Sequence, residues 1–243
     1  MPLIIHNISN RNFWARHRVE STEEGKEFAM GSKKCLTGIF VILVLFIGCA
    51  GVPVREAVKV NLSVPVGKIE GNQFTGIRYP FRVSAPSGWK VTVEIPNFME
   101  ELGYERPGLE ESQVFIFNPS TQSNLQIDFT PAGRYARFSQ ESIESLSTMA
   151  TGSLKEELEK DYGKGVKVEI GPTTPFSLKG VPFAAKKYAT YTLKGVKREQ
   201  GWIYGFSEPY QIFILYMILE KEGANDRQDI AKILDSFEVT PRK

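Results

Sequence analysis

The sequence has 243 residues, 42% of them hydrophobic, and its 30 basic residues nearly balance 28 acidic ones, for a net charge of +2. This near balance excludes the strongly basic surface on which nucleic-acid binding depends. Both histidines (His6 and His17) and both cysteines (Cys35 and Cys49) lie within the first 49 residues. Ser-His-Asp catalysis, histidine-bound zinc and disulfide bonds are therefore excluded from the rest of the chain.

An apolar run at residues 36–47 follows two lysines and precedes Gly48 and Cys49. A membrane-spanning helix needs about 20 apolar residues, so this shorter run favours the hydrophobic region of a signal peptide. A small residue directly before a cysteine at the end of such a region resembles a bacterial lipobox. The resemblance implies that Cys49 carries diacylglycerol and that the chain is cut after Gly48. The alternatives are ordinary cleavage, an uncleaved anchor over residues 35–54, or an internal helix.

Residues 1–29 lie upstream of a normal signal-peptide opening at Met30. They show no sustained hydrophobic period, and we interpret them as a misassigned start, with residues 30–48 as the signal peptide. The alternative is an extended cytoplasmic segment. Residues 49–70 have little periodicity and are predicted to form a tether, which leaves residues 71–243 as the folded domain.

The lipobox resemblance also implies a location. Ala50 follows Cys49, whereas an aspartate at this place retains many lipoproteins at the inner membrane. We therefore expect the periplasmic side of the outer membrane in a Gram-negative cell, and the exterior of the cell membrane otherwise. Two or more acyl chains hold a protein firmly, because each buried CH2 contributes about 0.8 kcal/mol. The membrane is thus the first predicted partner.

Short strands are predicted at residues 73–75 and 78–84, because apolar and polar residues alternate in these stretches and turn residues bound them. A helical turn at residues 98–102 lies within a long irregular stretch. A hairpin of residues 113–118 and 124–130 follows. In its second strand apolar residues alternate with polar ones, which predicts that one face is buried.

A single helix is predicted over residues 139–161, with Ser139 as its N-cap, because apolar residues recur every three to five positions. Further strands are predicted at residues 166–170, 183–193, 197–206 and 210–220. The last of these is apolar on both sides and must be covered on both faces. Asn225 is expected to cap a final helix with one apolar stripe, and Val239 to make a short last pairing.

These elements predict an α+β domain with a single antiparallel β-sheet of six to eight strands, flanked by helices on both faces. Their order resembles the PsbP-like superfamily. The residues that carry this resemblance are Tyr79-Pro80-Phe81-Arg82-Val83, Pro86-Ser87-Gly88-Trp89, residues 176–180 and residues 233–237. The resemblance implies an α/β/α sandwich over about residues 70–240 and accessory or binding roles without shared catalytic residues. Fold alone does not settle function.

Four aromatic residues are candidates to line an apolar ligand groove under residues 92–112. Trp202, Tyr204 and Phe206 are predicted to share one strand face, and Tyr210 follows the next turn. The alternative is that all four are core residues, as aromatic strand residues most often are.

Signals for catalysis are few. The chain has no G-x-S-x-G, Walker A or G-x-G-x-x-G motif. Asp128 and Glu199 are the candidates for the acid pair of a carboxylate-dependent cell-wall hydrolase. Glutamates at residues 100–111 offer oxygen ligands for calcium but are expected to form a solvated loop. The lysines of the strand at residues 183–193, including Lys186, are interpreted as protection of an exposed strand edge.

The sequence therefore predicts a lipid-anchored, non-enzymatic protein of the cell envelope, without a cofactor or bound metal. It is expected to bind an unknown protein or small-molecule partner and no nucleic acid. The alternatives are the carboxylate-dependent hydrolase and a purely structural or stress-related envelope component.

Overall fold

The computed structural model describes residues 58–102, 104, 112–133, 138–149, 154–221 and 224–240. The predicted upstream extension, the signal peptide, and Gly48 with Cys49 lie outside these ranges, so those assignments stay predictions. Within the described ranges, no helix is both long and apolar enough to cross a membrane.

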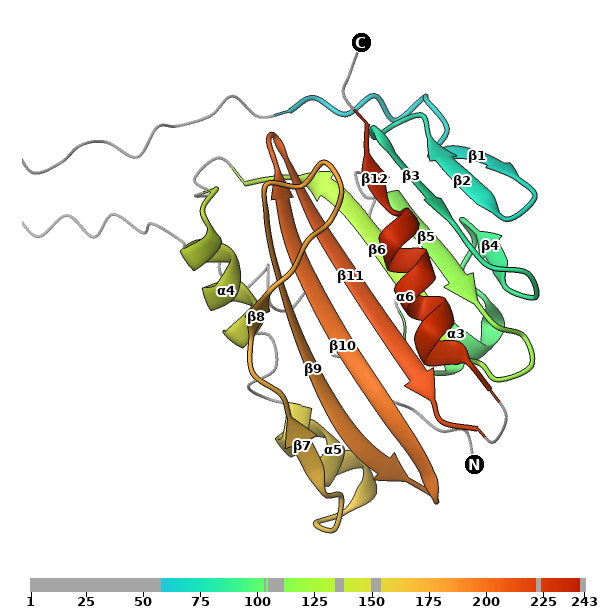
Figure 1. The fold of residues 1–243 in the computed structure, drawn as a ribbon, viewed down its shortest axis with the longest axis vertical. Coiled ribbons are helices and arrows are strands. Elements are labelled where there is room, and N and C mark those ends of the chain that lie inside the picture. The colour runs from blue at the N-terminus through green and yellow to red at the C-terminus, as the bar shows by residue number, and fades with distance from the viewer. Residues whose placement is uncertain are drawn as a thin grey trace, which may run out of the picture.

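An antiparallel sheet of eight strands forms the centre of the domain (Figure 1). We call it the large sheet. Its strands lie side by side in the order β4 (Lys90–Thr92), β5 (Ser112–Phe117), β6 (Asn124–Pro131), β11 (Tyr210–Leu219), β10 (Val196–Ser207), β9 (Phe183–Leu193) and β7 (Val168–Ile170). The short strand β8 (Thr174–Pro175) also pairs with β9. The α+β class and the antiparallel pairing are as predicted.

A second sheet of four strands, the small sheet, corrects the prediction of a single sheet. Its order is β1 (Gly67–Glu70), β2 (Gln73–Gly76), β3 (Phe81–Ser84) and β12 (Glu238–Val239). The ring of Phe81 stacks on that of Phe129 in β6, with centroids 4.9 Å apart. Strand β3 therefore crosses over a face of the large sheet instead of extending its edge. Alternation predicts that a segment is a strand, but not which sheet it joins.

The helices cover both faces of the large sheet. The final helix α6 (Asp226–Ser236) packs against β3 and β11 on one face, which we call the front face. The opposite, back face carries α3 (Asn97–Glu101), α4 (Gln140–Met149) and α5 (Leu154–Tyr162). The single helix predicted over residues 139–161 is thus two helices. The sequence between them contains Gly152, and glycine costs a helix about 1 kcal/mol relative to alanine.

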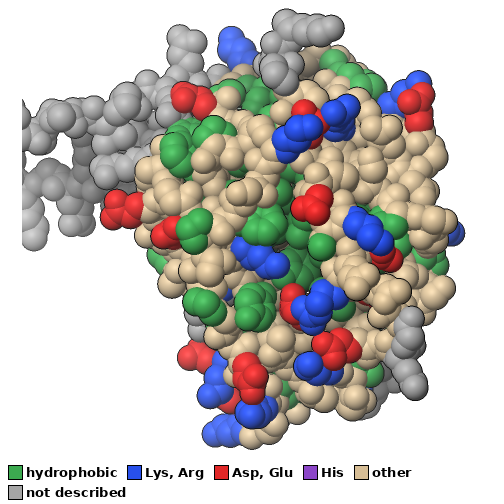
Figure 2. Space-filling view, in the orientation of Figure 1, with side chains coloured by type: hydrophobic (Ala, Val, Ile, Leu, Met, Phe, Trp, Pro, Cys, Tyr) green, Lys and Arg blue, Asp and Glu red, His purple; other side chains and the backbone are tan. Residues whose placement is uncertain are grey.

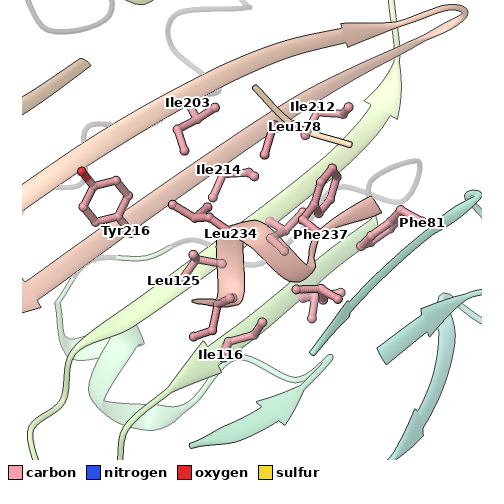
Figure 3. Packing of buried hydrophobic residues seen from close by; sticks show 14 of the residues in the cluster. Phe81, Ile116, Leu125, Leu178, Ile203, Ile212, Ile214, Tyr216, Leu234 and Phe237 are labelled. Carbon is pink, nitrogen blue, oxygen red and sulfur yellow. The ribbon is translucent and has the colours of Figure 1, made fainter. Parts of the chain in front are cut away.

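The core consists of two layers, one on each face. The front layer joins the large sheet to α6 and the small sheet, and Figure 3 shows Ile203, Ile212 and Ile214 of the sheet beneath Leu234 and Phe237. The back layer joins the sheet to the other helices. All residues of β11 are buried, as predicted for a strand that is apolar on both sides.

Two further expectations are corrected. Strand β6 is buried on both faces as far as Phe129, because its polar residues form hydrogen bonds under the back layer. The predicted tether over residues 49–70 is too long, since its last four residues form β1. Val58, Val60 and Val66 also pack against the front layer. The folded domain thus begins before residue 71.

Candidate functional site

Two acidic side chains are buried in the large sheet, and they lie on opposite faces. Asp128 is 6% exposed and stands opposite Phe213 of the back layer, whereas Glu199 is 7% exposed and stands opposite Ile218 of the front layer. A glycosidase needs two carboxyl groups about 5–10 Å apart in one groove. Asp128 and Glu199 therefore do not form the acid pair of a hydrolase. Among the described residues, no three His, Cys, Asp or Glu side chains are placed to hold a metal ion.

Glu199 is the centre of a charged cluster on the front face. Its Oε1 atom accepts a hydrogen bond of 2.9 Å from the Tyr216 hydroxyl, and its Oε2 atom pairs with the guanidinium of Arg227. Arg227 lies at the start of α6 and also donates to Glu220 over 3.2 Å. Lys197 reaches the same Glu220 carboxylate at 3.2 Å. The buried carboxylate of Glu199 is thus fully compensated by a cation and a hydroxyl, as a buried charge requires.

A glycine makes room for this arrangement. Gly201 lies between Tyr188 of β9 and Tyr216 of β11 in the strand register. A Cβ atom at Gly201 would stand 2.1–2.3 Å from atoms of the Tyr216 side chain, far inside contact distance. The absence of a side chain therefore lets the Tyr216 ring lie across β10 and place its hydroxyl on Glu199.

Lys186 completes the cluster from β9. Its Nζ atom lies 5.1 Å from the centre of the Tyr216 ring and 5.6 Å from that of Phe176, both within the range of cation–π attraction. The ion pairs and hydrogen bonds of the described chain include none for this ammonium group, which lies over the two rings. We call Lys186, Glu199, Tyr216 and Arg227 the front cluster.

Burial and charge change the pKa values of the front cluster. Burial lowers the pKa of Lys186, and the nearby carboxylate of Glu199 only partly opposes this effect. Burial also raises the pKa of Tyr216 far above its usual value, and the adjacent Glu199 raises it further. The hydrogen bond to Glu199 raises the pKa of Arg227. Tyr216 therefore remains a neutral hydroxyl that donates to Glu199.

The front cluster can bind an acidic group. Lys186 is half-buried and its donors make no hydrogen bond or ion pair in the described chain, and the neighbouring Tyr188 is exposed. Figure 2 shows this face of the molecule, with hydrophobic side chains at its centre and basic and acidic side chains around them. An aromatic surface with a cation at its rim suits a ligand that has an apolar part and a carboxylate or phosphate.

The predicted groove residues are not brought together by the fold. Trp202, Tyr204 and Phe206 belong to the back layer, whereas Tyr210 belongs to the front layer. This corrects the placement of Tyr210, because its ring packs edge-on against Tyr79 at 5.5 Å. Phe206 contacts the Phe138 ring at 4.9 Å. All four side chains are buried, and the ligand groove itself stays a prediction.

The back face carries a row of buried polar residues that the sequence did not single out as a group. The Tyr104 hydroxyl donates to Asn124 over 2.7 Å, and the Gln126 amide donates to Asp128 over 2.7 Å. Burial raises the pKa of both Tyr104 and Tyr204, and Asp128 adds to each shift. The Oε1 atom of Gln113 is buried without a partner. This row is covered by the back layer and offers no exposed charge.

Lys186 is the functional candidate that sequence reasoning assigned wrongly. The expectation that it protects an exposed strand edge is wrong, because β7 and β8 both pair with the outer side of β9. A signal was present in the sequence, since Lys186 alternates with Ala184 and Tyr188 on one face of a long strand. The pairing register of β9, β10 and β11 places Glu199 and Tyr216 beside Lys186, and the sequence pattern alone does not contain this register.

The sequence matches no known protein family, and no curated protein matches it significantly. Among solved structures, it is similar to cyanobacterial PsbP (CyanoP) from Synechocystis, with 12% identity and a TM-score of 0.45 over 73% of this chain and 100% of that chain. It is also similar to a protein from Bacteroides thetaiotaomicron, with 10% identity and a TM-score of 0.42 over 72% of this chain and 50% of that one. LpqN, described as involved in cell envelope biogenesis of Mycobacterium tuberculosis, shows 13% identity and a TM-score of 0.41 over 66% of this chain and 83% of that one. Similarity at this level carries no argument about function.

Proposed function

We propose that this chain is an exported protein held at a bacterial envelope membrane by lipid on Cys49. Its domain acts as a non-catalytic binding or accessory module, and the front cluster binds an acidic group of the partner. The partner is a protein or a small molecule with a carboxylate or phosphate beside an apolar part.

One observation carries the binding proposal. Lys186 is half-buried among aromatic rings without a hydrogen bond or ion pair, and burial of its ammonium group lowers its pKa more than the nearby Glu199 raises it, so the charged group opposes folding. A methionine or leucine would fill the same space without that cost. The presence of a lysine at this place is explained if the ammonium group meets an anion from outside the chain.

Two observations argue for binding over catalysis. The buried acids Asp128 and Glu199 lie on opposite faces, and Glu199 is held by Arg227 and Tyr216. A carboxylate with both oxygens engaged is a poor general base. This arrangement favours a fixed recognition surface over the alternative of a cell-wall hydrolase.

The anchor is supported by the sequence of residues 36–49 and is tested in cells. In a Cys49→Ser variant the thiol that would carry lipid is absent, so we expect the protein to leave the membrane fraction or to keep its signal peptide and run at a larger size. The matched control is Cys35→Ser, which lies in the removed segment and should change neither property. An unchanged size and membrane association in Cys49→Ser would contradict the anchor.

The binding site is tested by affinity capture of the native lipoprotein from membranes. Lys186→Met removes the charge on the front face and should lose the captured partner. Lys187→Met is the matched control, because this neighbouring lysine lies on the same strand but on the opposite face. Equal capture by both variants would contradict the site. Failure of the unmodified protein to capture any partner would favour the purely structural alternative.

A further inference from the structure

Three exposed apolar side chains gather at the small-sheet end of the domain. Ile77 is 52% exposed, Leu62 47% and Ile69 37%, and they make up half of the large hydrophobic residues that are exposed in the described chain. All three lie within a span of sixteen residues in and before the small sheet. Single exposed apolar residues are ordinary, but a local concentration of them indicates an interaction surface.

The backbone holds this surface in place. The Arg78 guanidinium donates to the Val64 carbonyl from Nε at 3.2 Å and from Nη2 at 3.0 Å, and Nη2 also reaches the Leu62 carbonyl at 3.5 Å. The Ile77 amide donates to the Val66 carbonyl over 3.1 Å. The segment that carries Leu62 is thus fixed beside Ile77, so both side chains are presented by ordered backbone.

The same end of the molecule is basic. Apart from Arg78, whose guanidinium binds backbone carbonyls, its basic residues are Lys59, Lys68, Arg82 and Lys179, and its acidic ones are Glu70, Asp235 and Glu238. Lys68 pairs with Glu70, whereas Arg82 and Lys179 share the single carboxylate of Glu238, and Lys59 is exposed nearby. Aliphatic side chains among cations are the combination that binds the head-group region of an anionic lipid surface.

The length of the chain before this surface places it near the proposed anchor. Val58 follows Cys49 by nine residues, which can span at most about 30 Å when fully extended. Val58 and Val60 pack against the front layer, so the chain enters the domain there. Figure 1 shows the start of the described chain and the small sheet at one end of the long axis, and the turn between β9 and β10 at the other.

We propose that the small-sheet end is the surface that this domain lays on the membrane, with Leu62 and Ile77 at the lipid interface and the nearby lysines facing anionic head groups. The inference rests on the proposed lipid anchor at Cys49, because the anchor is what brings this end to the bilayer. The domain is then oriented on the membrane, with the β9–β10 turn directed away from it.

The test uses the lipidated protein, purified from membranes and reconstituted into vesicles of phosphatidylethanolamine and phosphatidylglycerol. Single cysteines are introduced as Leu62→Cys and Ile77→Cys and labelled with a fluorophore that reports polarity. Lys167→Cys is the matched control, because its side chain is 86% exposed and lies beside β7, far from the small sheet in Figure 1. Flotation of the vesicles reports anchoring separately.

We expect the labels at residues 62 and 77 to shift their emission to shorter wavelength and to lose intensity with spin-labelled lipid, while the control label does neither. If the protein floats with the vesicles but the three labels behave alike, the proposed orientation is overturned and the anchor stands. A shift without quenching by lipid means that protein covers the surface, which also overturns the orientation. If the protein does not float, the anchor itself is wrong.

Discussion

The front and back faces of the large sheet each bury one carboxylate, yet they compensate it in different ways. On the front, Glu199 is held by Arg227 and the Tyr216 hydroxyl, and a further cation, Lys186, stands beside them. On the back, Asp128 accepts from the neutral amide of Gln126 under a closed layer. Buried charge needs partners in both places. Among the described residues, the front arrangement leaves the Lys186 ammonium group beside the charged pair without a hydrogen bond of its own.

The largest loss of stability is expected from a substitution at Gly201 on the front face. Gly201→Ala places a Cβ inside the Tyr216 ring, and overpacking of this kind costs about 3 kcal/mol. We expect a loss of that size in the free energy of unfolding in urea, together with loss of the Tyr216–Glu199 hydrogen bond. Gly165→Ala is the control, since nothing lies within 4 Å of its added Cβ. Equal stability of the two variants would mean that Tyr216 does not lie across β10.

Replacement of the two buried acids by their amides compares the faces directly. Glu199→Gln removes the anion that Arg227 and Tyr216 contact, and hydrogen bonds to a charged group contribute about 2 kcal/mol. Asp128→Asn keeps an acceptor for the Gln126 amide and should cost less than about 1 kcal/mol. Urea unfolding of both variants measures the difference. A larger loss for Asp128→Asn would reverse our assignment of the charged and neutral faces.

Removal of single hydroxyl groups should have a smaller effect. Tyr216→Phe loses a hydrogen bond to a carboxylate and should cost about 1.5 kcal/mol, whereas Tyr104→Phe loses one to the neutral Asn124 and should cost about 1 kcal/mol. Thermal unfolding of the two variants under identical conditions ranks them. The front variant should also shift the titration of Lys186 measured by NMR, and the back variant should not.

Lys186→Met should change the free energy of unfolding least, and it should raise this free energy where the other substitutions lower it. Burial lowers the pKa of Lys186 in the folded protein, so the charged group opposes folding in full at any pH below the lowered pKa, and the unfolded chain binds more protons between the lowered and the ordinary pKa. Methionine removes this penalty and should stabilise the protein at pH 7. The advantage should shrink as the pH rises through the lowered pKa towards the ordinary one. Urea midpoints at pH 7 and pH 10 measure it, and a destabilised variant at pH 7 would contradict it.

Much of the meander formed by β9, β10 and β11 could be predicted because its turns carry strong local signals. The expected strand at residues 183–193 coincides with β9. Lys194 and Gly195, which close the β9–β10 hairpin, both have positive φ angles of 50° and 78°, the backbone conformation that a tight two-residue hairpin turn requires. Local chemistry at the turn thus determined the ends of both strands.

The sheet face on which each side chain of these strands lies depends on the pairing register as well as on the turns. A two-residue turn pairs Ser207 with Tyr210, so Tyr210 shares a face with Ser207 and not with Phe206. The expected placement of Tyr210 beside Trp202, Tyr204 and Phe206 is wrong for this reason. The crossing of β3 over the front face and the meeting of Lys186 with Tyr216 depend on contacts between segments far apart in sequence, and no local pattern encodes them.

The pairing of β3 with β12 has a practical consequence for work on this protein. It brings the last strand of the domain against one of the first, at Glu238 and Arg82. An affinity tag or fluorescent protein fused to the carboxyl terminus would therefore be attached close to the proposed bilayer side and could lift the domain from it. Fusions inserted between Lys194 and Gly195, at the far tip, would leave that side undisturbed.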